Sequence, residues 1–429
     1  MNYKDTIDFL YSQLPAYHRI GKAAYKNNLQ NTLALDDYFK HPHKKYRTVH
    51  IAGTNGKGSV AHMAASVLQE AGYRTGLYTS PHLKDFRERI RINGEMIPEK
   101  EVISFVEDHS HILKTVLPSF FEMSVAMALD YFAREKVDIA VIEVGLGGRL
   151  DSTNIITPLV SVITNIGHDH MDLLGDSLKK IAFEKAGIIK RGVPVLIGEE
   201  KSETKNIFLS SAKSAGSQVY FAEENFSCDL ERIELSHTLR NFKVTEVKKK
   251  KQFAGAIPLG GDYQAANIRT LFQLFSCLED ILNVTEENIV DGIRNVVINT
   301  GLQGRWQVLD RHPLIICDTG HNLEGLKCVI KQVLEIPVTK RHFVIGFVSD
   351  KDLTSLLPLF PSESEYYFTK ASVPRAMDEK KLMAEASHYG LNGRCYSSVI
   401  EAYNAAKRDA AISDLIFVGG STFIVSEVI

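Results

Sequence analysis

A lysine set among glycines is the strongest chemical signal in the sequence. Residues 50–59 read His-Ile-Ala-Gly-Thr-Asn-Gly-Lys-Gly-Ser, and such glycines let backbone N–H groups converge on an anion. Lys57 is spaced to reach the outer phosphates of a nucleotide, and Ser59 to offer its hydroxyl to a magnesium ion. The spacing departs from the usual G-x-x-x-x-G-K-[ST] pattern, so we interpret the segment as a variant phosphate-binding loop; a glycine turn with a chance lysine is the alternative. The residues of this loop that are predicted to contact the nucleotide are Gly53, Thr54, Asn55, Gly56, Lys57, Gly58 and Ser59.

Two further residues that could hold the metal follow predicted strands. Glu143 lies at the end of a buried strand predicted over 138–144, and His170 lies in the loop after the next strand. Magnesium prefers oxygen ligands and retains water, and an imidazole can join a carboxylate around a metal. An isolated Glu or His is more often a surface or core residue, but both lie at the predicted active edge. We therefore predict both as metal ligands, with Asp169 and Asp172 as alternates to His170.

Regular elements must position these groups. An apolar run at 46–51 and a helical pattern at 60–70 flank the loop, which predicts strand, loop and helix in that order. Further strands are predicted at 75–79, 138–144, 159–164 and 194–197, and helices at 121–136 and 178–188. This alternation predicts a mostly parallel sheet with helices on both faces. The polar loop 80–90 would lie at the carboxyl ends of its strands, where such sheets bind ligands.

The pattern of apolar and polar residues changes twice in the second half of the chain. Residues 219–257 alternate in a shorter, more polar pattern, which predicts a β-rich insertion or edge hairpins. Helices are predicted at 260–277 and 286–297, and the periodicity lapses at 299–304. We place the domain boundary there, giving an ATP-binding domain at 1–298 and a second domain at 305–429. The second pattern predicts a smaller Rossmann-like α/β domain with strands at 314–317, 342–347, 365–368 and 415–418 and helices at 323–334, 378–388 and 399–408.

Composition narrows the class of protein. The 429 residues are 44% hydrophobic and 24% charged, with a net charge of −2, so no global basicity favours nucleic acid. The basic run at 248–251 is interpreted as a solvated hairpin rather than an interface. Five scattered cysteines without a C-x-x-C pair fit a reducing cytoplasm. An amphipathic start and a polar, glycine-containing stretch to Asn31 carry no signal-peptide core, and no run of about 18 apolar residues predicts a membrane span. No heptad pattern calls for a partner chain, so we expect a cytoplasmic monomer.

Taken together, these segments resemble the Mur-ligase-like amide synthases and, within them, the folylpolyglutamate synthases, whose bacterial members often double as dihydrofolate synthases. The resemblance covers nearly the whole chain. It is carried by residues 50–59, 79–89, 143–154, 165–170, 183–188, 304–306, 318–322 and 346–352. It implies a two-domain enzyme that uses ATP to phosphorylate the carboxylate of dihydropteroate or a folate and then joins the acyl phosphate to the amine of L-glutamate.

The same resemblance implies roles for individual residues. Lys57, Arg305 and magnesium would supply positive charge to the transferring phosphoryl group. The lysine corresponding to Lys185 is carbamylated in the family and serves a second metal; without the resemblance, pairing with a neighbouring carboxylate would be preferred. Two magnesium sites are therefore expected, with a monovalent cation as an additional candidate. The implied catalytic set is Lys57, Lys185, Arg305 and His321, and the implied nucleotide contacts beyond the loop are Asn267, Arg305, Asp318, His321 and Asn322.

The substrate sites are implied in the same way. The loop 80–86 resembles the segment that holds the pterin-bearing substrate, with two aromatic rings available for stacking, although an aromatic is more often core. The implied folate contacts are Ser80, Pro81, His82, Leu83, Phe86 and Phe121. Residues 350–352 and 372–375 fit the pattern of the glutamate site. Dihydropteroate, tetrahydrofolate and folates that already carry glutamate all present a carboxylate on a similar frame, so each is a candidate acceptor.

Two other protein classes share features with this sequence. Cell-wall Mur ligases carry an additional N-terminal domain for the uridine nucleotide before the phosphate loop, whereas here the loop begins at His50. A nucleotide-switch protein is suggested by residues 172–175, Asp-Leu-Leu-Gly, which match the GTPase pattern D-x-x-G. No Asn-Lys-x-Asp or Thr-Lys-x-Asp motif for reading guanine accompanies it. A folate-directed glutamate ligase is therefore the main prediction.

Overall fold

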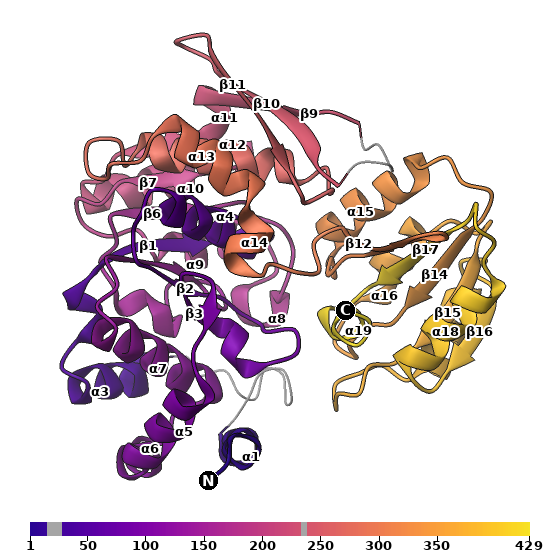
Figure 1. Ribbon diagram of the computed structural model, residues 1–429, viewed down its shortest axis with the longest axis horizontal. Coiled ribbons are helices and arrows are strands. Elements are labelled where there is room, and N and C mark those ends of the chain that lie inside the picture. The colour runs from indigo at the N-terminus through magenta and orange to yellow at the C-terminus, as the bar shows by residue number, and fades with distance from the viewer. Residues whose placement is uncertain (15–27, 233–237) are drawn as a thin grey trace. The chain divides into compact units, whose positions relative to one another are not determined.

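The structure is a computed structural model that describes residues 1–14, 28–232 and 238–429 (Figure 1). The chain divides into two compact units. The first consists of the described residues of Met1–Arg232, Leu239–Pro258 and Gln264–Leu302, and the second mainly of Leu259–Tyr263 and Gln303–Ile429. Most of the polar stretch predicted before Asn31 falls on residues 15–27, outside the described residues.

The first unit is built on an eight-stranded sheet with the strand order β4-β3-β2-β5-β1-β6-β7-β8. Six of these strands run parallel, while β3 and β4 form an antiparallel edge. The central strands β1, β5 and β6 are buried along almost their whole length, as expected for a parallel sheet covered on both faces. The strands are β1 Arg47–Ala52, β2 Thr75–Tyr78, β3 Ile90–Ile92, β4 Glu95–Met96, β5 Ile139–Glu143, β6 Val160–Ile163, β7 Val195–Ile197 and β8 Val219–Phe221. The predicted parallel sheet is confirmed.

Helices cover this sheet. They are α1 Tyr3–Gln13, α3 Gln30–Tyr38, α4 Lys57–Glu70, α5 Glu99–Asp108, α6 Ser110–Val116, α7 Phe120–Arg134, α8 Met171–Leu174, α9 Leu178–Ala186, α10 Ser202–Ala215, α11 Ala222–Asn225, α12 Gln264–Ser276, α13 Glu286–Arg294 and α14 Val296–Thr300, with short 3₁₀ turns η2 Pro42–Lys45, η3 Phe86–Arg89 and η4 Ser152–Ile155. Helix α4 begins at Lys57 rather than at Val60 because Gly56, with a φ of 85°, ends the loop and becomes the N-cap. The predicted helix 286–297 is interrupted at Asn295, which separates α13 from α14.

The β-rich insertion is also confirmed. Strands β9 Phe226–Leu230, β10 Arg240–Glu246 and β11 Lys251–Ile257 form a separate antiparallel sheet. The lysines between β10 and β11 are exposed and form the predicted hairpin. Helix α12 begins at Gln264 rather than at 260, because the side chain of Gln332 holds the preceding backbone: it accepts from the N–H of Asp262 and donates to the carbonyl of Gly260.

The second unit is a six-stranded sheet with the order β12-β13-β17-β14-β15-β16, parallel except at β12. Its strands are β12 Gln307–Arg311, β13 Leu314–Cys317, β14 Arg341–Ile345, β15 Glu365–Thr369, β16 Gly393–Tyr396 and β17 Leu415–Gly419, and its helices are α15 Leu323–Glu335, α16 Leu353–Leu356, α17 Glu379–Ser387, α18 Val399–Asp409 and α19 Thr422–Ser426, with the 3₁₀ turn η5 Leu357–Leu359. Phe343 and Ile345 pack in one core with α15 and α17, while Val344 packs in another with α18. This alternation confirms helices on both faces. Edge strands β12 and β16 were not predicted, because they are half-exposed and lack an apolar run.

Among the described residues, the helices are all too short or too polar to cross a lipid bilayer.

Candidate active site

The glycine-rich loop follows β1 at the carboxyl edge of the first sheet, as predicted. Gly53 has a φ of 148° and Gly56 a φ of 85°. An added Cβ would lie 1.9 Å from Oγ1 of Thr164 at Gly53 and 2.3 Å from Oδ1 of Asn267 at Gly56. Both positions therefore require glycine, for conformation and for space. Ser59 is buried in the first turn of α4, which directs its helix N-terminus toward this edge.

A second loop, after β6, fixes the shape of the first. The backbone N–H of Thr54 donates to the carbonyl of Asn165 at 3.0 Å, and the N–H of Asn55 donates to the Asn165 side chain at 2.9 Å. Thr164 donates from its hydroxyl to the carbonyl of Asn55 at 2.6 Å, and Thr54 Oγ1 accepts from the N–H of Gly167. These bonds hold the loop backbone in one conformation, so part of the cost of organising a phosphate cradle is met before a ligand binds.

Lys57 and Lys185 converge on Gly53. Nζ of Lys57 donates to the carbonyl oxygen of Gly53 at 2.9 Å and to that of Thr54 at 3.1 Å. Nζ of Lys185, which comes from α9, donates to the same Gly53 oxygen at 2.8 Å. Burial, and then the positive charge of Lys57, lower the pKa of Lys185 to about 7. The lowered pKa makes the neutral amine of Lys185 more accessible near neutral pH than that of an ordinary lysine.

Glu143 lies on the strand next to β1. In the register of the parallel pair, Glu143 is opposite Ile51, just before the loop. Its side chain is buried and accepts from the backbone N–H of Ser80 at 3.0 Å, which links it to the predicted folate loop. A buried carboxylate at the carboxyl edge is suited to hold a cation.

His170 lies on the other side of β1, in the loop after β6. It has a φ of 50° and caps the short helix α8. Its backbone N–H donates to Asp169, and its Nε2 lies 3.9 Å from the same carboxylate. Among the described residues, no three His, Cys, Asp or Glu side chains at this edge have their ligand atoms within 4.8 Å of one another. The predicted ligands Glu143 and His170 thus do not form a ready-made protein cage. Magnesium often retains water and takes ligands from substrate phosphates, so this arrangement suits it.

The predicted folate loop is organised by Glu88. Its carboxylate accepts from the backbone N–H groups of Leu83, Lys84 and Asp85 at 2.7 to 3.0 Å. His82 accepts at Nδ1 from the guanidinium of Arg89 at 2.7 Å, so its proton is on Nε2, which faces the hydroxyl of Tyr11 at 3.1 Å. The peptide bond between Ser80 and Pro81 is cis.

The two aromatic residues predicted for stacking differ in exposure. Phe86 is only 2% exposed, and its ring packs edge-on against Phe120 and His82. Its faces are therefore covered by protein. Phe121 is half-buried, lies 6.1 Å from the ring of Tyr78 and covers Gly145, where a Cβ would meet the Phe121 ring at 2.3 Å. Of the two rings, Phe121 has the surface that a ligand could contact.

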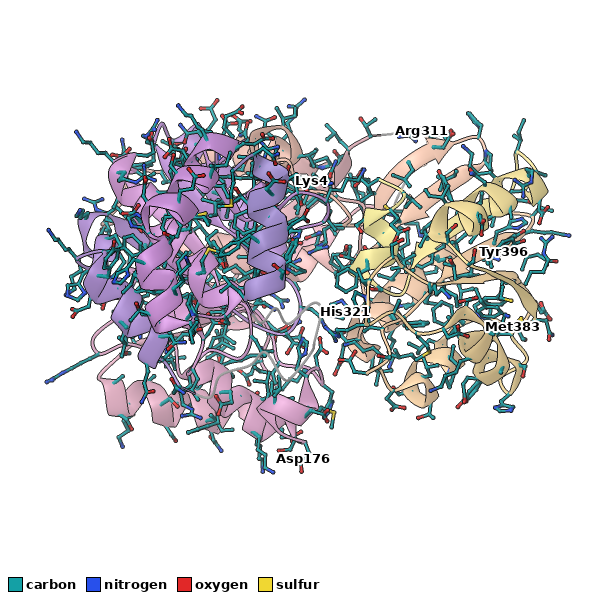
Figure 2. All side chains as sticks on the ribbon, turned by 90° about the horizontal axis from the view of Figure 1, so that it is seen from below. Lys4, Asp176, Arg311, His321, Met383 and Tyr396 are labelled. Atoms are coloured by element: carbon teal, nitrogen blue, oxygen red, sulfur yellow. The ribbon has the colours of Figure 1, made fainter. Side chains whose placement is uncertain are left out.

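In the second unit, the predicted nucleotide residues follow β13. The buried carboxylate of Asp318 accepts from the Tyr263 hydroxyl at 2.6 Å and from the backbone N–H groups of Trp306 and Gly320 at 2.7 Å. His321, labelled in Figure 2, faces the carbonyl of Thr319 with Nδ1 at 3.0 Å, so Nδ1 carries the proton in that bond.

Two other predicted residues of this unit have local structural partners. The guanidinium of Arg305 donates to the hydroxyl of Thr319. Asn322 is the N-cap of α15, and its side-chain oxygen accepts from the N–H of Gly325 at 2.9 Å. In the region predicted for glutamate, Arg375 donates to the carboxylate of Asp350 at 2.6 Å.

Sequence reasoning missed three residues that contact the phosphate loop. Thr164 and Asn165 bond to its backbone as described above. Gln264 donates to the hydroxyl of Ser59 at 3.4 Å and accepts from the amide of Asn267, itself predicted near the adenine. Thr164 is the last residue of a predicted strand and Asn165 directly follows it, and this position is a signal that could have found them. Gln264 carried no comparable signal.

Comparison with known proteins adds to this geometry. The sequence profile of the Mur ligase middle domain matches residues 51–271, and that of the Mur ligase glutamate ligase domain matches residues 304–422. The chain is 31% identical to the folylpolyglutamate synthase of Lacticaseibacillus casei, over 100% of this chain and 98% of the relative.

Solved structures of related proteins have the same fold as this chain. The structure of Escherichia coli FolC in complex with DHPP and ADP superposes with a TM-score of 0.85 at 28% identity, covering 100% of this chain and 97% of that one. The bifunctional folylpolyglutamate synthase/dihydrofolate synthase of Yersinia pestis, complexed with AMPPNP and a manganese ion, gives a TM-score of 0.83 at 27% identity, with coverage of 100% and 97%. The described chain is thus similar to these proteins along its whole length.

Proposed function

The chain belongs to the Mur ligase family and, within it, to the folylpolyglutamate synthases, and from this premise we propose how its residues carry out the ligation. The protein is an ATP-dependent ligase that activates the carboxylate of dihydropteroate or a folate as an acyl phosphate and joins it to L-glutamate. It uses ATP and a divalent metal ion. The single observation that carries the residue assignment is the convergence of Lys57 and Lys185 on the glycine loop after β1.

The reaction has two steps. A carboxylate oxygen of the pterin-bearing acid attacks the γ-phosphorus of ATP, and the bond from that phosphorus to the bridging oxygen breaks to release ADP. The amine of glutamate then attacks the acyl carbon, loses a proton and displaces phosphate. Activation is needed because a carboxylate is a poor electrophile. Negative charge accumulates around the phosphoryl group in the first step, so positioned cations lower its barrier.

We propose that Lys57 stabilises this negative charge, because its ammonium group lies against the loop that would hold the phosphates. Arg305, Asp318, His321 and Asn322 are proposed as the contribution of the second unit to the nucleotide site. Asp318 is fixed by three donors, so it holds one orientation without a ligand. Asn267 contacts the loop through Gly56 and is proposed to set the adenine side of the site.

Magnesium would be held by Ser59, Glu143, His170 and a modified Lys185. The donor chemistry fits, because among the residues that the structure describes the buried Ser59 hydroxyl has only a long bond from Gln264 at 3.4 Å, and the carboxylate of Glu143 is buried at the adjacent strand end. When bound, the ion would neutralise phosphate charge. A monovalent cation is a further candidate at this edge.

We propose that Lys185 is carbamylated. Its neutral amine, populated because the pKa is about 7, adds to carbon dioxide, forming an N–C bond and releasing a proton. The product is an anion that can ligate magnesium and also pairs with Lys57, so two repelling cations become an attractive pair. The alternative is an unmodified ammonium that only donates to Gly53.

The folate is proposed to bind along the loop 80–86 and against the exposed part of Phe121. Ser80 connects this loop to Glu143, so the substrate loop and the metal ligand are joined directly. We also propose that the enzyme is cytoplasmic, because it needs ATP. Fractionation of the producing cells would test this location.

Phosphate release tests the function. ATP and L-glutamate are supplied with dihydropteroate, with tetrahydrofolate or with no acceptor, and each product is weighed by mass spectrometry. Both acceptors should stimulate release, and each product should gain glutamate. Stimulation by tetrahydrofolate alone would restrict the activity to polyglutamylation. Release that is indifferent to acceptor and glutamate would contradict the ligase.

A further inference from the structure

A cluster of two histidines and an aspartate lies at the opposite end of β1 from the phosphate loop. Asp36 is near the end of α3, and His41 and His43 lie in the turn that leads through η2 into β1. One atom from each side chain can be chosen so that all three lie within 4.8 Å of one another, the only such group of His, Cys, Asp or Glu among the described residues. Helix α3 and η2 both pack on α7 (Figure 1).

The carboxylate of Asp36 is buried, and one of its two oxygens lacks a hydrogen-bond partner among the described residues. Its side chain is 6% exposed. Oδ2 is 2.6 Å from Nδ1 of His41, whereas the buried Oδ1 has no hydrogen-bond partner among the described residues. Asp36 also borders a small pocket otherwise lined mainly by apolar side chains, among them Val125 and Leu129 of α7. A carboxylate in such surroundings requires a cation close by.

The spacing to His43 fits a shared metal better than a hydrogen bond. Nε2 of His43 is 3.4 Å from Oδ1, and its side chain is 8% exposed. That separation is longer than an ordinary N–H···O bond. It is close to the distance of about 3.3 Å between two ligands on one tetrahedral zinc ion with bonds of about 2.0 to 2.1 Å.

His41 is the third candidate ligand and the most exposed of the three. Its side chain is 42% exposed, and its Nε2 lies 3.5 Å from the carboxylate of Asp37. That distance is longer than an ordinary hydrogen bond, but it places a carboxylate beside the ring nitrogen that would not bind the metal, where a metal-binding histidine commonly has one. Nδ1 would exchange its present bond to Asp36 for the ion.

We propose that Asp36, His41 and His43 form a site for a divalent transition-metal ion, with zinc as the preferred ion, that pins the turn between α3 and β1. Two imidazoles and one carboxylate are a common zinc ligand set, and water would take the open position facing solvent. Magnesium is disfavoured here because two of the three protein ligands are imidazoles, whereas magnesium prefers a shell made mostly of oxygen atoms. The site is separate in sequence from the residues assigned to the ligation and lies at the other end of β1 from the phosphate loop.

Zinc titration of the full chain tests this, with magnesium in excess to occupy oxygen-rich sites. Calorimetry should give one zinc per wild-type chain. The H41Q/H43Q variant should lose that site or bind at least about tenfold more weakly, since losing even an outer-shell partner of a metal ligand costs about 10- to 100-fold. H388Q, at the exposed histidine that follows the last residue of α17, should bind zinc as the wild type does.

Thermal unfolding supplies the second readout. Zinc should raise the Tm of the wild type and of H388Q, but not that of H41Q/H43Q, because only a ligand that binds the folded state stabilises it. If the double variant does not fold, the single variant H41Q replaces it in both measurements and should show the same loss, since His41 is substantially exposed. No zinc uptake by the wild type, or equal uptake and equal Tm shifts in wild type and histidine variant, would overturn the proposal.

Discussion

The ammonium groups of Lys57 and Lys185 donate to one acceptor, the carbonyl oxygen of Gly53, at 2.9 and 2.8 Å. Two positive charges on one oxygen repel each other, and one of them is buried. The repulsion disappears when Lys185 loses its proton. A carbamate on Lys185 would replace it with attraction to Lys57, because the carbamate is an anion. The geometry therefore favours the chemical state in which Lys185 can serve a metal.

Replacing Lys185 by Ala should reduce kcat by at least about 100-fold, since a ligand of a charge-stabilising metal is removed. Small carboxylates such as acetate or formate should restore part of the rate, because they can occupy the space of the carbamate. The control is Lys180→Ala on the same helix, an exposed lysine that pairs with Asp176. An active Lys185→Ala enzyme would remove this residue from the metal site.

Carbamylation should rise with pH through about 7. The pKa of Lys185 is depressed to about 7, so the amine is protonated below this pH and neutral, and reactive toward carbon dioxide, above it. Carbon-13 NMR with labelled bicarbonate, at matched concentrations of dissolved carbon dioxide, should show a carbamate signal that grows across this window. Lys185→Met should lack the signal. A wild-type spectrum without it would contradict the modification.

Lys57→Ala should lower phosphoryl transfer by at least about 100-fold, because the charge it places at the phosphates is lost. Single-turnover measurement of acyl phosphate formation isolates this step. Lys44→Ala, at an exposed lysine in η2, is the control. A near-normal rate in Lys57→Ala would overturn the assignment of the glycine loop.

The elements that could be predicted from the sequence are those with one dominant pattern. The strand ending at Glu143 is a continuous apolar run, and its burial on both faces followed from that run. The start of α4 was misplaced because glycine and lysine carry little apolar periodicity, whereas the positive φ of Gly56 decides where the helix begins.

Contacts between distant segments could not be predicted in the same way. Gln264 reaches Ser59 across a separation of 205 residues, and no local pattern encodes that pairing. Phe86 also shows the difference: its type suited a stacking platform, but packing against Phe120 buried its ring. Whether an aromatic side chain is platform or core depends on its three-dimensional neighbours.

Asp318→Asn should destabilise the protein by about 1 to 3 kcal/mol, because the amide N–H₂ cannot accept and one of three buried donors would lose its partner. Burial raises the pKa of Asp318, so the neutral amide also relieves some desolvation cost, which favours the lower part of the range. Urea unfolding measures the change. Asp310→Asn, the same substitution on exposed β12, should stay within about 0.5 kcal/mol of wild type. Equal effects would show that the three donors do not depend on the carboxylate.

Gly56→Ala should cost both stability and nucleotide affinity. A residue other than glycine is strained by about 1 to 2 kcal/mol at positive φ, and here the new Cβ would also lie 2.3 Å from Oδ1 of Asn267. Gly72→Ala is a matched control, because its φ of 83° is nearly the same as the 85° of Gly56 and nothing lies within 4 Å of the added Cβ. The two substitutions share the backbone strain, so their difference in unfolding free energy reports the contact with Asn267.

The double variant Gly56→Ala/Asn267→Ala separates that contact from the loop's own geometry. Measured against Asn267→Ala alone, the cost of Gly56→Ala in unfolding free energy should fall to that of Gly72→Ala, because the side chain that the new Cβ would meet is gone. If Gly56→Ala and Gly72→Ala cost the same and bind ATP alike, the close approach of α12 does not shape the phosphate loop.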